Sequence, residues 1–310
     1  MKTLSCIIST LFIALTLMEA KESVSTVNSI DNLIDSFIEK QDLKKQNVYD
    51  ISSELNKIGY FEDVKIYLIS LANLTPPYDK LIAENKEQER LIKKYENDIK
   101  TKKEKSNKHF VLLIKDKKFT ALIDTGFLHT QDSLIKALKQ TNTNASDIDY
   151  LILSHGHKDH LGGILKDNKN IFSKAKLIID EKEYTWLKES KDDLVRKSVE
   201  AFAEPIFLKD ENEFLQGNSV KISSKKAYGH TPGHRFFLIN EQKKQDLNIF
   251  FIADLIHTSL QVKNPDISIQ YDYDKDLARK TRKKFAKEFE SVYNNIIIGS
   301  HSPSIIHFNK

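Results

Sequence analysis

Short apolar runs separated by polar stretches recur along most of the chain, and their length is typical of buried strands. A brief polar link at residues 115–118 joins two of these runs, which predicts a hairpin. Apolar residues at helical spacing instead predict amphipathic helices within residues 21–57 and 81–100. The strand-like runs cover residues 63–71, 110–115, 119–124, 149–154, 250–254 and 296–301.

The first 20 residues differ in character from the rest of the chain. Lys2 precedes an uncharged run from Leu4 to Met18, which is the pattern of a secretory signal peptide and is too short for a spanning helix. We expect cleavage after Ala20 and a periplasmic or secreted protein, with an uncleaved N-terminal anchor as the alternative. Cys6 is the single cysteine, so the mature chain has neither a disulfide nor a thiolate ligand.

Composition narrows the classes of partner. A hydrophobic content of 40% suffices for a buried core, and the net charge of +4 comes from lysines scattered among acids. Nucleic-acid binders concentrate basic residues in a patch, so we expect no nucleic-acid partner. The densest basic run, residues 102–108, has the composition of a connector. We also expect no membrane association of the mature form.

Residues 155–160 read His-Gly-His-Lys-Asp-His, directly after one of the predicted strands. Neutral imidazole and carboxylate are the donors that divalent transition metals accept. Four donors so close together do not all reach one ion easily. We therefore expect His155 and His157 to hold one ion and Asp159 and His160 a second. The alternative is a solvated histidine cluster in a loop.

The segment Ser154–Gly163 resembles the His-x-His-x-Asp-His motif of the metallo-β-lactamase superfamily. This resemblance implies an α/β fold, an αββα sandwich with a dinuclear metal site at one edge of the two sheets. It covers residues 60–310 as a hydrolase domain, after a signal peptide at 1–20 and a helical extension at 21–59. It implies two divalent metal ions, zinc first, with manganese, cobalt and iron as alternatives.

Later segments match the same family in the expected order. His234, in the Thr-Pro-Gly-His turn, is expected to join His155 and His157, and Asp254 to bridge both ions. His301 is expected to join Asp159 and His160, and Asp124 to support the metal loop from outside. The implied metal ligands are His155, His157, Asp159, His160, His234, Asp254 and His301.

Residues 257–282 resemble the methyl parathion hydrolase and lactonase-like branch of the superfamily. The expected reaction is attack by a water shared between the metals on a lactone or activated ester, with organophosphate triesters as further small-molecule substrates. Asp159, Asp254 and His257 are the expected catalytic residues, with His257 binding the substrate oxygen or protonating the leaving group. A homodimer is compatible with this family.

Three alternatives stay open at this point: a thiol-free β-lactamase, a phosphodiesterase or nuclease, and a metal-binding protein without catalysis. The remaining histidines are assigned lesser roles. His230 is expected to support the ligands from outside, and His109 and His129 to lie on the surface. Trp186, Phe236 and Phe237 are expected in the core, and residues 81–100 on the surface or as a lid.

Overall fold

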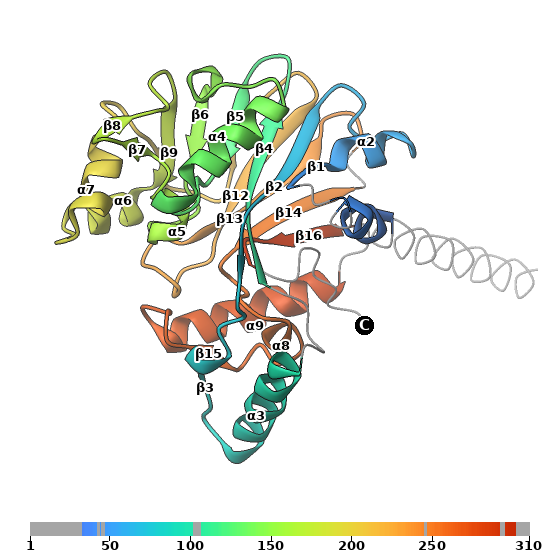
Figure 1. The fold of residues 1–310 in the computed structure, drawn as a ribbon, viewed down its shortest axis with the longest axis vertical. Helices are drawn as coiled ribbons and strands as arrows, with labels where there is room; N and C mark the ends of the chain where they lie inside the picture. Colours follow the sequence, from blue (N-terminus) through green and yellow to red (C-terminus); the bar gives the residue numbers. More distant parts are fainter. Residues whose placement is uncertain are drawn as a thin grey trace, which may run out of the picture.

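The computed structural model describes residues 33–41, 44, 47–101, 107–244, 247–291 and 295–301. Two β-sheets face each other, and helices cover the outer face of each sheet (Figure 1). The expected signal peptide and the residues after His301 lie outside this description, as do residues 102–106 of the basic run.

The first sheet contains seven strands, in the order β1-β2-β4-β5-β6-β9-β10. The strands from β1 to β5 pair antiparallel, and β5, β6, β9 and β10 pair parallel. The predicted hairpin is confirmed as β4 and β5. The strands are β1 (Val48–Asp50), β2 (Lys65–Leu74), β4 (Asn107–Lys115), β5 (Thr120–Ile123), β6 (Tyr150–Ile152), β9 (Lys176–Asp180) and β10 (Ile206–Leu208).

The second sheet contains five strands, in the order β11-β12-β13-β14-β16. Its pairs are antiparallel except for β14 and β16, which run parallel. The strands are β11 (Glu213–Gln216), β12 (Val220–Lys226), β13 (Arg235–Glu241), β14 (Asn248–Ala253) and β16 (Asn295–Gly299). A separate small hairpin pairs β7 (Leu165–Lys166) with β8 (Lys169–Asn170).

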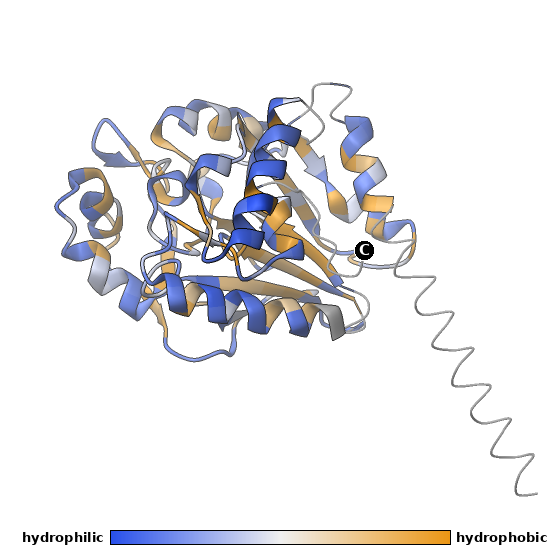
Figure 2. Cartoon of the chain, turned by 90° about the horizontal axis from the view of Figure 1, so that it is seen from below, coloured by the Kyte–Doolittle hydropathy of each residue, from blue (hydrophilic) through white to orange (hydrophobic). Residues whose placement is uncertain are grey.

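Alternation along the strands explains the layers. In β4, Leu112 and Ile114 face the core between the two sheets, whereas Val111 and Leu113 face outward. That outer face packs on α4 (Gln131–Gln140), α6 (Glu181–Lys188) and α7 (Asp193–Glu200). The second sheet packs on α9 (Lys275–Ser291) through Phe285 and Phe289. Apolar strands therefore fill the centre, between helices with hydrophilic outer sides (Figure 2). The predicted αββα sandwich is confirmed.

A smaller unit lies beside α9, in the lower part of Figure 1. It contains α3 (Lys86–Lys100), α8 (Ser259–Lys263) and the pair β3 (Leu81–Ile82) with β15 (Ser268–Ile269). Tyr95 of α3 packs with Ile267 and Ile269 in a satellite core. The expected helix within residues 81–100 is thus present, and its apolar side is anchored rather than free.

The N-terminal segment is more closely joined to the domain than expected. Residues 33–41 are helical, and Ile34 and Ile38 contribute to the core between the sheets. Strand β1 pairs with β2, so part of the predicted helical extension is sheet. A strand of three residues shows too little alternation to be read from sequence. The helix α2 (Ile51–Asn56) follows it, and the division at residue 59 stays a prediction.

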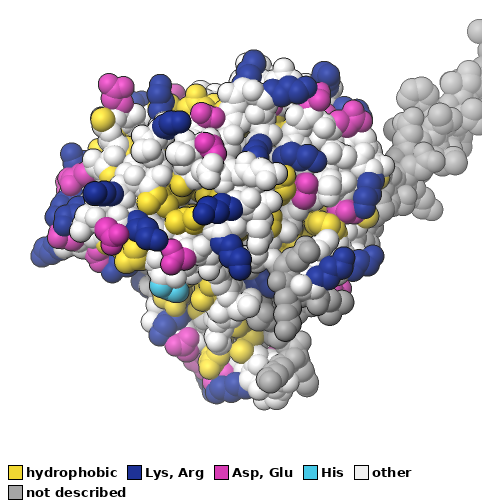
Figure 3. Space-filling model, turned by 45° about the horizontal axis from the view of Figure 1, so that its top comes forward, with side chains coloured by type: hydrophobic (Ala, Val, Ile, Leu, Met, Phe, Trp, Pro, Cys, Tyr) yellow, Lys and Arg dark blue, Asp and Glu magenta, His cyan; other side chains and the backbone are white. Residues whose placement is uncertain are grey.

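Two further observations concern the surface. None of the helices in the described part of the chain is long and apolar enough to cross a membrane. Lys, Arg, Asp and Glu side chains are interspersed over the face drawn in Figure 3.

The short elements not yet named are α5 (Lys158–Leu161) and the 3-10 helices η1 (Tyr78–Lys80), η2 (Leu128–Thr130) and η3 (Ala145–Asp147).

Candidate metal centre

The candidate ligands follow the ends of strands from both sheets. His155 and His157 follow β6, and α5 then presents Asp159 and His160. Asp254 and His301 follow β14 and β16, which run parallel and therefore end at the same edge. Ala253, just before Asp254, has a φ of 47°, so this strand ends in a left-handed turn that few non-glycine residues adopt.

The first group of side chains comprises His155, His157, His230 and Asp254. His155 Nε2 lies 3.1 Å from His157 Nδ1, and His230 Nε2 lies 3.4 Å from Asp254 Oδ2. Ligands about 2.0–2.2 Å from one tetrahedral ion lie roughly 3.4 Å apart. These side chains are thus spaced to share one ion.

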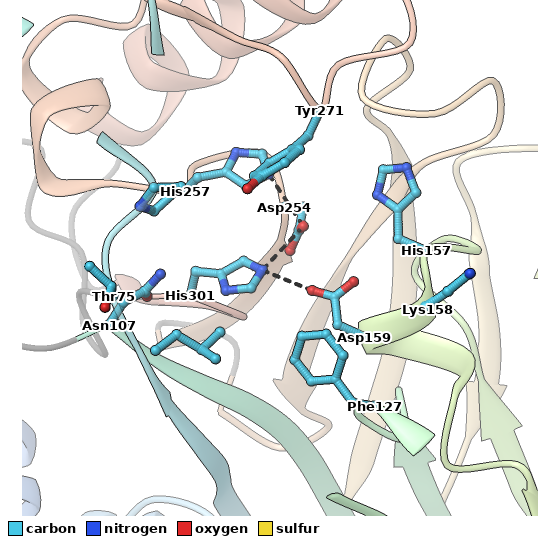
Figure 4. Close-up of a pocket in the computed structure, with 12 residues that line it drawn as sticks. Thr75, Asn107, Phe127, His157, Lys158, Asp159, Asp254, His257, Tyr271 and His301 are labelled. Atoms are coloured by element: carbon cyan, nitrogen blue, oxygen red, sulfur yellow. Dashed lines mark ion pairs between the residues drawn. The ribbon is translucent and has the colours of Figure 1, made fainter. Parts of the chain in front are cut away.

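The second group comprises His109, Asp159, His160 and His301. His301 Nε2 lies 3.3 Å from Asp159 Oδ2 and 3.3 Å from Asp254 Oδ2, and Figure 4 marks both ion pairs. His160 Nε2 lies 3.2 Å from Asp254 Oδ1. Asp254 therefore contacts both groups, which is the position of a bridging carboxylate.

Unsatisfied buried atoms test whether metal ions fit here. His160 Nε2, His230 Nε2 and Asp254 Oδ1 are buried, with no hydrogen-bond partner among the described residues. Leaving such atoms unpaired costs about 1–3 kcal/mol each. Burial lowers the pKa of His157 to about 3, so its ring is in the neutral form that binds metals. The donor set fits divalent ions.

The Gly229–His234 turn corrects one prediction. His234 was expected to be the ligand and His230 its support, but the structure places His230 in the first group. His234 Nδ1 donates to Ala227 O, at 3.1 Å, and its Nε2 accepts from the Asp254 backbone N–H, at 3.3 Å. Both nitrogens of His234 are therefore occupied, and it positions Asp254 instead.

Carboxylates behind the ligands fix the orientation of two imidazoles. Asp272 Oδ1 lies 3.0 Å from His230 Nδ1, so the Nε2 atom of that ring points into the site. Asp124 Oδ2 lies 2.8 Å from His160 Nδ1, which bears out the supporting role expected of Asp124. Metal-binding histidines usually have such partners. Although burial lowers the pKa of His230, the neighbouring carboxylates of Asp254 and Asp272 raise it to about 9.

His109 is a second correction. It was expected on the surface, but its side chain is fully buried and belongs to the second group. Its strand β4 lies next to β2 and β5 within the first sheet, and His109 is near the start of β4. A lone histidine without a motif gives no indication of such a position in the sequence. The apolar pattern of β4 was the one available sign that a residue of this strand is buried.

Glu183 is a buried residue of α6 that the sequence analysis did not single out. Its carboxylate accepts hydrogen bonds from the backbone N–H groups of Gly156 and Gly233 and from the Thr231 hydroxyl. Burial raises the pKa of Glu183 to about 7, and these three bonds oppose that rise. Glu183 thus ties the metal loop to the Gly229–His234 turn.

A cavity of about 620 Å³ opens onto the two groups (Figure 4). His257 lies on its wall, with Nε2 3.3 Å from Asp254 Oδ2 and its ring 6.0 Å from that of Tyr271. Neither ring nitrogen of His257 has a hydrogen-bond partner among the described residues. The lining residues are Leu74, Thr75, Pro77, Asn107, Phe127, His157, Lys158, Asp159, Asp254, His257, Tyr271 and His301.

The remaining expectations have mixed outcomes. His129 is exposed, and Phe236 and Phe237 are buried in the core, as predicted. Trp186 is only half-buried and lines a second cavity of about 410 Å³ beside His157, which corrects its assignment to the core. The segment before α3 lines the main cavity through Thr75 and Pro77, whereas no residue of α3 itself does.

A mixed αββα sandwich with paired His and Asp groups at one edge defines a class of metal-dependent hydrolase. Residues 107–301 match the metallo-β-lactamase superfamily, so the chain belongs to this family. The matched range contains every ligand discussed above.

Two curated relatives agree with this assignment. One is hydroxyacylglutathione hydrolase GloC of Haemophilus influenzae, 28% identical over 135 residues. The other is metallo-beta-lactamase domain-containing protein 1 of Xenopus laevis, 35% identical over 60 residues. These matches cover 43% and 19% of this chain, and 61% and 24% of the respective relatives.

Solved structures share the fold. AidC, a dizinc quorum-quenching lactonase in complex with a product, has a TM-score of 0.65 at 22% identity, over 78% of this chain and 90% of AidC. The hydrolase AbOPH in the beta lactamase superfamily has a TM-score of 0.61 at 24% identity, over 79% of this chain and 89% of that chain. These likenesses concern the fold alone.

Proposed function

We propose that this protein hydrolyses lactones or activated esters at two divalent metal ions, one in each group. The observation that carries the proposal is the shared position of Asp254, between two groups of His and Asp that face one cavity. A volume of about 620 Å³ is within the range of small-molecule sites. The fold of AidC, a lactonase, supports the choice of substrate.

The ions would lower the pKa of a water between them and polarise a substrate carbonyl. His155, His157 and His230 would hold one ion, and Asp159, His160 and His301 the other. Asp272 and Asp124 keep His230 and His160 in the tautomer that presents Nε2. Zinc is the first choice of metal, with manganese, cobalt and iron as alternatives.

His257 is proposed to act on the substrate directly. Its ring lines the cavity beside Asp254. Neither ring nitrogen has a hydrogen-bond partner among the described residues, so both are available to a bound substrate. Burial lowers the pKa of His257, so the neutral ring can accept a hydrogen bond or donate one from its N–H. It is thus placed to bind a substrate oxygen or to pass a proton to the leaving alkoxide.

The apolar part of the cavity wall bears on substrate choice. Leu74, Pro77 and Phe127 line the cavity together with Tyr271, so an acyl chain or aromatic group has surface to pack against. The same wall suits the substituents of an organophosphate triester, which we retain as a secondary substrate class.

A substrate panel on the metal-loaded mature protein tests this function. We expect turnover of acyl-homoserine lactones or p-nitrophenyl esters that is lost with chelator and in His157→Ala and Asp254→Ala. His129→Ala is the matched control, because this histidine is exposed and belongs to neither group. Turnover of nitrocefin alone would make the protein a β-lactamase, and activity retained in both ligand variants would overturn the proposal.

We further propose that the chain is exported and that its mature form acts on small molecules away from the membrane. The basis is the pattern of Lys2 and the uncharged run after it. Sequencing the N-terminus of protein recovered from the periplasm or medium tests this: a start at Lys21 supports it. An intact N-terminus in the membrane fraction would indicate an anchor instead.

A further inference from the structure

His109 has a buried ring with no hydrogen-bond partner among the described residues. It lies in β4, fully buried, and neither Nδ1 nor Nε2 is satisfied. An imidazole carries one N–H donor and one lone pair in its neutral form. Burying such groups without partners costs about 1–3 kcal/mol each. A ring in this state indicates that something else binds it.

The surroundings of His109 restrict what that can be. The ring of Phe127 lies against it, with centroids 5.4 Å apart, and offers no hydrogen-bond acceptor of ordinary strength. The rings of His301 and His160 also contact it, with centroids 5.1 Å and 5.3 Å from that of His109. Residues of the second group are therefore among its polar neighbours.

The distances match ligation of one ion. His109 Nε2 lies 3.8 Å from Asp159 Oδ2, and one ligand atom from each of the four side chains lies within 4.8 Å of the others. Two ligands at about 2.1 Å from one ion are roughly 3.4 Å apart when tetrahedral and roughly 4.2 Å when opposite. The separation of 3.8 Å lies between these limits.

We propose that His109 is a direct ligand of the metal ion held by Asp159, His160 and His301. The proposal rests on the metal centre of the proposed function and is independent of its substrate.

An additional imidazole makes the two metal positions unequal. The second position would have His109, Asp159, His160, His301 and the shared Asp254, whereas the first has three histidines and Asp254. Zinc in proteins usually takes four ligands, whereas manganese and iron accept six. The second position should therefore discriminate less strongly in favour of zinc than the first does.

Cobalt substitution tests the ligand role without any substrate. Each histidine bound to Co²⁺ gives one exchangeable, paramagnetically shifted N–H resonance in the proton NMR spectrum. We expect His109→Gln and His109→Ala to lose one such resonance relative to the unmutated protein, and His129→Ala to lose none. Added imidazole should restore second-ion binding in His109→Ala, because the deleted ring leaves a cavity of its own size.

Titration with Zn²⁺ and Co²⁺ gives the second measure. We expect one of the two binding steps to lose more than about 100-fold in affinity, beyond the roughly 10–100-fold typical when an outer supporting partner is removed. An unchanged far-UV circular dichroism spectrum and an unchanged affinity in the other binding step would show that the variants fold. Retention of every shifted resonance would overturn the proposal, even with weaker binding, because His109 would then only brace Asp159. Absence of lactone or ester turnover would not affect this result.

Discussion

The two histidines of the Gly229–His234 turn have opposite surroundings despite their similar place in the sequence. His230 Nδ1 is held by Asp272 and its Nε2 faces the first group, whereas both nitrogens of His234 are bonded to backbone. Only a ring with a free, correctly directed nitrogen can bind an ion. Which of the two histidines can bind an ion therefore depends on the hydrogen-bond partners of each ring.

This contrast predicts different effects of substitution. His230→Ala should weaken binding of the first ion by more than about 100-fold, a larger loss than removal of an outer partner causes. His234→Gln, which keeps a donor and an acceptor, should retain two ions per chain. Metal content after dialysis against a competing chelator measures both. If His234→Gln alone lost an ion, the assignment from the motif would be restored.

At the scale of elements, the absence of a side chain at Gly229 lets the Gly229–His234 turn pack closely on α9. Gly229 has a φ of 125°, and a Cβ there would lie 2.2 Å from the backbone N of Ala278. The Asp274 backbone N–H, just before α9, also donates a hydrogen bond of 2.9 Å to Gly229 O. The register of the turn on α9 thus sets where His230 points.

Gly229→Ala should therefore disturb metal binding as well as stability. We expect a loss of roughly 1–3 kcal/mol from overpacking, together with weaker binding of the first ion. Gly59→Ala is the matched control: its φ is 82°, but its nearest neighbour is the flexible end of Lys244. Chemical denaturation and metal titration should show both defects in the first variant and only a stability loss in the control. Equal metal affinities in the two variants would contradict this.

The satellite core around α3 affects the site through the cavity wall. Ile269 of β15 is fully buried against Tyr95 and Leu81, and Tyr271, two residues further, lines the cavity. Loosening this core should displace Tyr271 without touching the ligands.

Ile269→Ala should thus destabilise the protein by about 2–5 kcal/mol and raise KM with little change in metal content. Leu138→Ala on α4 is the control, since it removes a buried leucine on the outer face of the first sheet. We expect it to lose similar stability with KM unchanged. Steady-state kinetics with the best substrate of the panel would decide, and a KM unchanged in Ile269→Ala would exclude this role of the satellite core.

At the scale of the whole molecule, the ligands connect the two sheets. His109 and Asp159 come from the first sheet and its loops, whereas Asp254 and His301 follow strands of the second. Ions bound between them should therefore stabilise the sandwich. A ligand present at a thousand times its Kd stabilises by about 4 kcal/mol.

Removal of metal should accordingly lower Tm. We expect a clear decrease after treatment with EDTA, and recovery when Zn²⁺ or Mn²⁺ is returned in excess, measured by differential scanning calorimetry. Binding to the folded state alone causes this shift, since the ligands are far apart in the unfolded chain. An identical Tm for the stripped and reloaded protein would show that the ions contribute nothing to the fold.

Much of the fold was predictable because strand pattern and motif position are local properties. The runs before Asp254 and His301 are short and apolar, so the strands could be predicted from the sequence. The hairpin at residues 110–124 was predictable for the same reason. The ligand roles of Asp254 and His301 followed from the resemblance of their segments to the family. Strand β1 was missed because three residues carry too little periodicity.

The sequence by itself determined the strand ends through the short apolar runs. Its resemblance to the metallo-β-lactamase superfamily implied the αββα architecture and most of the candidate metal ligands, because the motifs that carry the resemblance are contiguous. The tertiary structure alone decided between His230 and His234, and brought His109 from β4 to the second group. These choices depend on Asp272, on the backbone of Ala227 and Asp254, and on packing between distant strands. No local pattern records such contacts, because they form only when the two sheets meet.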